Sequence, residues 1–137
     1  GMVLNCESRR THNIFTEDGI EHDYLHMDGQ EVYKFAVRQC PKCLLEALEK
    51  ADMTADDIDY FVLHQANVRI IESVAKRLKA PVEKFPMTLG YTGNMSAASV
   101  PVMLDSLVRD GGLKRGDKVA MSAFGAGLTY GAIVLEW

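Results

Sequence analysis

The sequence has no long hydrophobic segment, few cysteines and no basic excess, and each absence argues against a class of protein. No apolar run approaches the roughly 18 residues that a membrane-spanning helix needs, and the amino terminus lacks the pattern of a secretory signal. Fifteen basic against nineteen acidic residues give a net charge of −4, whereas nucleic-acid-binding domains more often carry a basic excess. Three cysteines, an odd number, favour a reduced, cytoplasmic setting over a disulfide framework.

What remains is the composition of one globular domain. The 137 residues are 47% hydrophobic and 25% charged, and a chain of this length can bury a real core. Residues 2–31 are polar and rich in turns, which predicts irregular structure with one short strand. Gly1 is expected to be a scar of tag removal.

Helical and extended patterns alternate through the rest of the chain, which indicates an α/β fold with helices layered on a sheet. Thr54 and Asn67 are expected to cap helical segments, and Gly111-Gly112 to end the last helix. Pro41 is expected to kink the first helix or to mark a second start. Apolar spacing predicts helices over 31–51, 68–79 and 96–109, strands over 60–63, 119–124 and 128–137, and a short strand over 85–89.

Polar residues follow the predicted strand over 60–63. His64, Gln65 and Asn67 lie where ligand crevices open in α/β sheets, at the carboxyl end of a strand. A lone histidine in such a place is nevertheless more often structural. In a second polar turn, over 93–96, helix capping explains Asn94 as well as a functional role does.

Small residues cluster at two places. The run Ser96-Ala97-Ala98-Ser99-Val100-Pro101 predicts a closely packed, buried central helix. Phe124-Gly125-Ala126-Gly127 joins two apolar strands, and its small residues would let backbone N–H groups converge on an oxyanion. We reject a dinucleotide-binding loop because position 130 is tyrosine where that motif needs glycine, and because a strand follows.

Two groups with metal-ligand spacing are interpreted as structural. Cys40-Pro41-Lys42-Cys43 lies within a predicted helix and no second CxxC accompanies it, so the cysteines are expected to pack in the core. His22 and His26 are four residues apart in an irregular segment. We therefore expect no metal site.

Several basic side chains could form a patch on this acidic protein. Such charges are usually a solvated helix face, but they could also dock an acidic partner. They are Lys34, Arg69, Lys76, Arg77 and Lys79.

Three of these segments together, residues 64–67, 93–101 and 124–127, resemble in order and spacing the C-terminal half of β-ketoacyl-acyl-carrier-protein synthase III. Asp28-Gly29-Gln30-Glu31-Val32 opens the region as in that family, so the resemblance covers residues 24–137 and leaves 1–23 as an irregular N-terminal segment. It implies half of a thiolase-like α/β fold with a mixed sheet, in a dimeric acyltransferase that initiates fatty acid synthesis. An acyl group from acyl-CoA condenses with malonyl on acyl carrier protein. Both thioesters are substrates, and no cofactor is implied.

The resemblance also implies roles for individual residues. His64 and Asn94 match the last two members of a Cys-His-Asn triad, and two neutral N–H donors would stabilise the enolate that decarboxylation leaves. The Ala126 N–H would help to form the other oxyanion hole, where the family usually has glycine. Further matches are Gly29, Ala66, Asn67 and Phe124 to the pantetheine channel, and Lys34, Arg69, Lys76 and Arg77 to the carrier-docking surface.

The chain departs from the family in its nucleophile, because Cys6, Cys40 and Cys43 do not match the cysteine of the family's N-terminal half. It is expected to be an excised domain or a short natural product, inactive without that half. It is also expected to dimerise or aggregate through an open sheet edge and the exposed face that the other half would bury. Two alternatives stay open. One is a noncatalytic thiolase-fold module that binds carrier protein or a partner subunit, and the other is a related acyltransferase of secondary metabolism.

Overall fold

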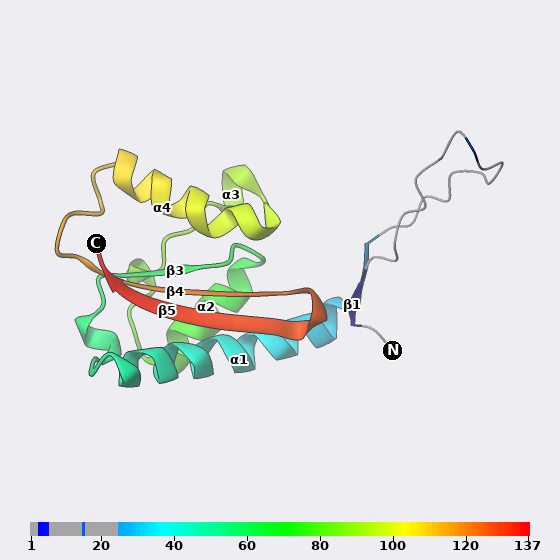
Figure 1. Ribbon diagram of the computed structural model, residues 1–137, viewed down its shortest axis with the longest axis horizontal. Helices are drawn as coiled ribbons and strands as arrows, with labels where there is room; N and C mark the ends of the chain where they lie inside the picture. Colours follow the sequence, from blue (N-terminus) through cyan, green and yellow to red (C-terminus); the bar gives the residue numbers. More distant parts are fainter. Residues whose placement is uncertain (1–2, 6–14, 16–24) are drawn as a thin grey trace.

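The computed structural model describes residues 3–5, 15 and 25–137, in which a three-stranded mixed sheet lies between two layers of helices (Figure 1). Strand β3 (Tyr60–Leu63) pairs in parallel with β4 (Lys118–Gly125), and β4 pairs antiparallel with β5 (Thr129–Glu136). The predicted α/β fold with a mixed sheet is confirmed. Within the described residues β3 and β5 form the two edges of this sheet, so association through an edge stays a prediction.

Helices cover both faces of the sheet. α1 (Gly29–Lys50) and α2 (Val68–Leu78) lie on one face, and α3 (Leu89–Thr92) and α4 (Ser99–Arg109) on the other (Figure 1). Strands β1 (Leu4–Asn5) and β2 (His26–Met27) form a separate antiparallel pair. The stretch over 2–31 therefore contains two short strands where one was predicted, because each supplies the backbone partner of the other. Four short 3₁₀ turns complete the described elements: η1 (Ala55–Asp57), η2 (Val82–Lys84), η3 (Ser96–Ala98) and η4 (Ala126–Leu128).

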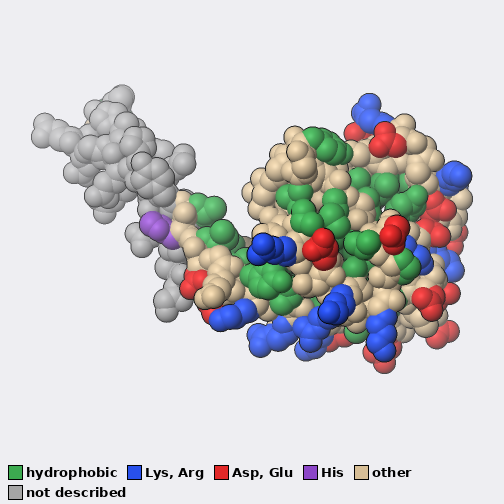
Figure 2. Space-filling view, turned by 180° about the vertical axis from the view of Figure 1, so that it is seen from behind, with side chains coloured by type: hydrophobic (Ala, Val, Ile, Leu, Met, Phe, Trp, Pro, Cys, Tyr) green, Lys and Arg blue, Asp and Glu red, His purple; other side chains and the backbone are tan. Residues whose placement is uncertain are grey.

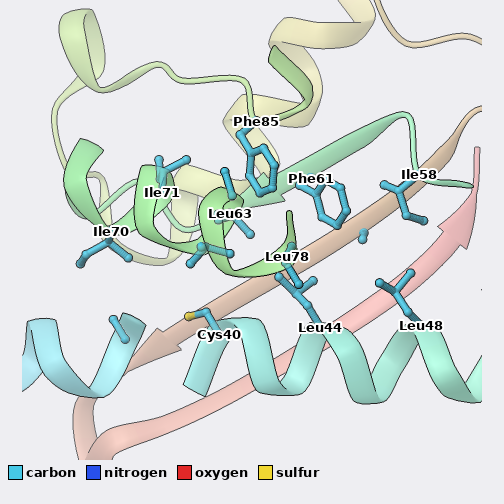
Figure 3. Packing of buried hydrophobic residues seen from close by; sticks show 14 residues of the cluster. Cys40, Leu44, Leu48, Ile58, Phe61, Leu63, Ile70, Ile71, Leu78 and Phe85 are labelled. Carbon is cyan, nitrogen blue, oxygen red and sulfur yellow. The ribbon is translucent and has the colours of Figure 1, made fainter. Parts of the chain in front are cut away.

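The core explains why β3 is apolar along its length. Successive side chains of a strand point to opposite faces, so Phe61 and Leu63 pack with α1 and α2 while Val62 packs with α4. All three are buried. Figure 3 shows Leu44 and Leu48 of α1 facing this layer. A strand covered on both faces cannot show polar alternation.

Most predicted elements are confirmed within one to three residues at their ends. Asp28 caps α1 by accepting from the N–H groups of Gln30 and Glu31, 3.0 Å each. The helix continues through Pro41 without a second start. Thr54 begins η1, as predicted, with its N–H donating to Asp57 at 2.8 Å.

The short strand predicted over 85–89 is wrong. Phe85 instead buries its ring against Phe61, with centroids 4.6 Å apart and planes at 7°. The N–H of Thr88 donates to the Oε1 of Gln65 at 3.0 Å, so a side chain takes the bond that a neighbouring strand would take. Pro86 between them has no N–H to donate.

The predicted buried helix over 96–101 needs correction as well. Only Ser99 of its small residues is buried, whereas Ala97, Ala98 and Pro101 are exposed in this chain. The reason is that α4 packs one stripe against the sheet, at Ser99, Met103 and Leu107. No helix in the described part of the chain is long and apolar enough to cross a bilayer.

Candidate active site

His64 lies immediately after β3, and its backbone N–H extends the ladder by donating to the Ser122 carbonyl at 2.9 Å. Its imidazole is half-buried, and the ring of Phe124 meets it edge-on with centroids 5.2 Å apart. Burial lowers the pKa of His64 below its ordinary value of 6.5 because desolvation disfavours the imidazolium. Burial therefore favours the neutral imidazole over the imidazolium.

Ser99, at the start of α4, holds this imidazole. Its Oγ lies 2.7 Å from Nδ1 of His64, accepts from the Gln65 N–H at 3.2 Å and is 2.9 Å from the Ser96 carbonyl. The hydroxyl has only one proton to give. If it donates to Nδ1, the imidazole proton is on Nε2; if it donates to Ser96, Nδ1 carries the proton.

Gln65 anchors the turn after β3. Its side chain is fully buried, donates from Nε2 to the Leu63 carbonyl at 2.9 Å and accepts from the N–H of Thr88. These bonds connect the end of β3 to the segment that leads into α3. The position of His64 is thus fixed from two sides.

Asn94 lies in the turn between α3 and η3 and is exposed. Its Oδ1 accepts from the N–H of Ser96 at 2.9 Å, while Gly93 and Ser96 take positive φ angles of 66° and 52°. A positive φ is uncommon for serine. The oxygen therefore shapes this turn, but Asn94 caps neither following helical element, because Met95 precedes η3 and Ala98 precedes α4 as the cap residues. The amide nitrogen makes no hydrogen bond among the described residues.

His64 and Asn94 come from different elements that Ser99 connects. Ser99 contacts His64 and follows Asn94 by five residues, which brings the end of β3 to the segment of the Asn94 turn. In the part of the chain that the structure describes, the two side chains are not hydrogen-bonded to each other. An open hollow of about 700 Å³ lies elsewhere, by the C-terminal end of α1 and η1. Among the described candidate residues, Lys79 of the basic patch lines it, and the residues matched to catalysis and the pantetheine channel do not.

The glycine loop between β4 and β5 is the turn η4. Its positive φ angles fall on Gly127 at 77° and Leu128 at 53°, not on Ala126. An alanine is therefore accepted in the middle of this loop without backbone strain. Ala126 is exposed, and its carbonyl accepts from Thr129 Oγ1 at 3.3 Å.

The residues matched to the pantetheine channel lie at three places. Phe124 contacts His64, and Ala66 and Asn67 form the turn into α2, where Asn67 Oδ1 accepts from the Arg69 N–H at 2.9 Å. Gly29 begins α1 and is exposed. β1 lies against η4, so the start of α1 is at the same end of the sheet as the glycine loop (Figure 1).

The four cations matched to carrier docking lie on α1 and α2 and are all exposed: Lys34, Arg69, Lys76 and Arg77. Two of them already have partners within the chain. Lys34 forms an ion pair with Glu31 at 2.7 Å, and Arg77 donates from Nη1 to the Val37 carbonyl at 3.0 Å. Figure 2 shows Lys and Arg side chains gathered along the lower edge of the molecule, where α1 lies.

The two cysteines of the CxxC are free and buried, which confirms the packing interpretation. Cys43 Sγ lies 3.4 Å from Ser122 Oγ. Burial raises the pKa of the Cys40 thiol to about 11 and also raises that of Cys43, so neither ionises readily. His22 and Cys6 lie outside the described residues, and the predictions about them are not tested.

Comparison with known proteins places the predicted residues in a wider context. A family profile described as 3-oxoacyl-[acyl-carrier-protein (ACP)] synthase III C terminal matches residues 48–137. The chain is 52% identical over 113 residues to β-ketoacyl-[acyl-carrier-protein] synthase III of Microcystis aeruginosa, covering 82% of this chain and 34% of that protein. The chain therefore spans about a third of the length of this relative.

Solved structures give the same picture. The 3-oxoacyl-[acyl-carrier-protein] synthase III of Aquifex aeolicus superimposes with a TM-score of 0.82 at 42% identity, over 83% of this chain and 37% of that one. The priming β-ketosynthase from the R1128 polyketide biosynthetic pathway gives a TM-score of 0.82 at 39% identity, over 97% and 40%. The fold is similar to part of both enzymes, as the thiolase-like prediction expected.

Proposed function

Because the chain belongs to the 3-oxoacyl-acyl-carrier-protein synthase III family through that family's C-terminal region, we propose that it supplies the decarboxylation machinery of such an acyltransferase. In the proposed reaction, acyl-CoA acylates a cysteine of the N-terminal half and CoA leaves. Malonyl on acyl carrier protein then loses carbon dioxide, and the resulting carbanion attacks the acyl thioester carbonyl and releases the cysteine thiolate. No cofactor takes part.

His64 and Asn94 are proposed to stabilise the enolate. Loss of carbon dioxide puts negative charge on the thioester oxygen, and two preorganised N–H donors stabilise that charge without a general base. The observation that carries the proposal is the half-buried imidazole at the end of β3, held by Ser99, and its burial lowers the pKa of His64. For Nε2 to donate from a neutral ring, Ser99 must give its proton to Nδ1.

The remaining residues are proposed to bind the substrates. The Ala126 N–H would contribute to the oxyanion hole for acyl transfer, and Phe124 would line the pantetheine channel beside His64. Gly29, Ala66 and Asn67 would complete that channel. The exposed cations on α1 and α2 would dock acyl carrier protein, because the proposed carrier is acidic and its charge would complement theirs.

Carbon dioxide release from malonyl-acyl-carrier protein tests the proposal. The chain would be assayed alone and after assembly with a cysteine-bearing N-terminal half, and we expect activity only in the assembly. His64→Ala and Asn94→Ala should each lower decarboxylation by about 10²–10³-fold while largely sparing acylation of the cysteine. Asp105→Asn, an exposed change on α4, is the matched control.

The second candidate is a noncatalytic thiolase-fold module that binds carrier protein or a partner subunit. It is favoured by the two described cysteines, whose buried, raised-pKa thiols do not suit a nucleophile. Carrier binding without decarboxylation in a demonstrably assembled complex would establish this module. The likeness to the polyketide priming ketosynthase leaves a secondary-metabolism acyltransferase as a variant of the enzyme proposal. Condensation rates of the assembled enzyme with different acceptor thioesters would distinguish the two.

A further inference from the structure

The hydrogen bond from Arg77 to the Val37 carbonyl lies where the backbone hydrogen-bond ladder of α1 lacks one donor. In an α-helix, each carbonyl accepts from the N–H four residues later. Four residues after Val37 lies Pro41, which has no N–H and whose ring presses against the carbonyl four residues before it. The guanidinium of Arg77 therefore supplies a donor where the sequence has removed the helical one.

A second polar contact lies one helical turn away. Tyr33 Oη of α1 and Ser73 Oγ of α2 are 3.2 Å apart. Tyr33 precedes Val37 by four residues, and Ser73 precedes Arg77 by four residues. The two helices therefore run in the same direction here, and the two bonds together fix how far one is shifted along the other.

This register determines where two of the exposed cations lie. Lys34 is adjacent to Tyr33 on α1, and Arg69 lies one turn before Ser73 on α2, on the stripe that continues to Arg77. A shift of α2 along α1 would change the spacing between Lys34 and Arg69. Any acidic partner that binds both cations depends on that spacing.

We propose that Arg77 is a positioning residue that bonds the Val37 carbonyl left without a donor by Pro41, and so aligns Lys34 and Arg69 for an acidic carrier protein. This assigns Arg77 to the α1–α2 contact, whereas the family resemblance assigns it to direct docking. The identity of the partner rests on the proposed function. The connection between Arg77, Val37 and Pro41 does not.

Urea unfolding of the 137-residue chain tests the connection. Arg77→Ala should raise the unfolding equilibrium constant by about fivefold to tenfold, as loss of one exposed hydrogen bond of ordinary net strength does. Pro41→Ala restores an N–H for Val37, so in that background Arg77→Ala should have an effect of less than about twofold. Pro41→Val restores the same N–H with a larger side chain and serves if the alanine variant does not fold.

Lys76→Ala is the matched control, because Lys76 is the adjacent exposed cation of α2 and has no bond to α1 in the described part of the chain. Lys76→Ala should change the unfolding equilibrium constant by the same small factor with either proline or alanine at position 41. Equal destabilisation by Arg77→Ala in both backgrounds would overturn the connection.

Steady-state kinetics of the assembled enzyme test the positioning role. Arg77→Ala should raise KM for malonyl-acyl-carrier protein about tenfold, and by much more than KM for malonyl-pantetheine. Adding Pro41→Ala should return the carrier KM to within about twofold of the value for Pro41→Ala alone.

Two contrary outcomes can be told apart. If Pro41→Ala removes the stability effect but not the KM effect, Arg77 contacts the carrier directly and the positioning role is wrong. If neither Arg77→Ala nor Arg69→Glu changes the carrier KM, the docking surface itself is wrong, and so is the proposed partner. The urea experiment reports on the Arg77–Val37 bond in either case.

Discussion

Nδ1 of His64 and Oγ of Ser99 lie 2.7 Å apart, and this contact joins the end of β3 to the start of α4. The serine is buried and the imidazole half-buried, so water competes only weakly for the bond. It orients the ring and selects which nitrogen carries the proton. If His64 donates to an enolate, Ser99 is the residue that makes Nε2 the donor.

Ser99 acts through His64 in the proposed mechanism and does not itself contact the substrate. Replacing Ser99 should nevertheless impair decarboxylation. In the assembled enzyme, we expect Ser99→Ala to lower carbon dioxide release by about tenfold to a hundredfold, because the imidazole loses its orientation and tautomer. Ser99→Thr keeps the hydroxyl and should recover part of the rate. Ser106→Ala, the same change on the same helix, is the control. An undiminished rate in Ser99→Ala would remove the assigned role.

The lowered pKa of His64 predicts how stability depends on pH. The folded state binds this proton less readily than the unfolded state, whose histidine has the ordinary pKa of 6.5. Below that value the unfolded state binds more protons, so the free energy of unfolding falls as pH drops through the folded pKa. Urea titrations between about pH 7 and pH 5 should show this loss, and His64→Gln should reduce it. An identical pH dependence in the variant would mean that other groups cause it.

The sequence predicted the sheet and the long helices because their patterns are strong and local. The apolar run over 60–63, Asn67 as a cap and the small residues of the glycine loop each have a direct structural meaning, and the structure confirms them. The strand predicted over 85–89 was wrong because the conformation of this segment depends on distant residues. Phe85 stacks on Phe61 and Thr88 bonds to Gln65, and neither contact can be seen in the local spacing.

The same limit applies to the candidate site. His64 and Asn94 stood out because polar residues in turns beside a strand or helix are conspicuous. Ser99 did not, since a serine among alanines predicts close packing, and its contact with a residue 35 positions away comes only from the fold. The compensation of Pro41 by Arg77 was missed for the same reason. A proline within a predicted helix is the signal that could have prompted a search for a replacement donor.

Burial of the CxxC predicts slow thiol chemistry. With its pKa raised to about 11, only about one Cys40 thiol in a thousand is ionised at pH 8. In a Cys6→Ser background, iodoacetamide should modify Cys40 and Cys43 much more slowly in the folded chain than in urea. Rapid modification of the folded chain would show that α1 opens readily around Pro41, and it would also weaken the argument that these thiols are not nucleophiles.

Charge reversal at Arg69 separates carrier docking from the chemistry of the thioester. Arg69 is exposed near the start of α2, three residues after the turn that holds Ala66. Arg69→Glu should raise KM for malonyl-acyl-carrier protein about tenfold, and salt should reduce the difference from the unaltered enzyme, because the attraction between exposed charges is screened. KM for malonyl-pantetheine, which has no protein surface to dock, should change far less.

Lys114→Glu makes the same charge reversal at an exposed cation in the loop after α4 and should change KM for neither substrate. If Arg69→Glu weakened both substrates equally, its effect would lie in the channel at Ala66 and Asn67, and the cations of α1 and α2 would be a solvated surface.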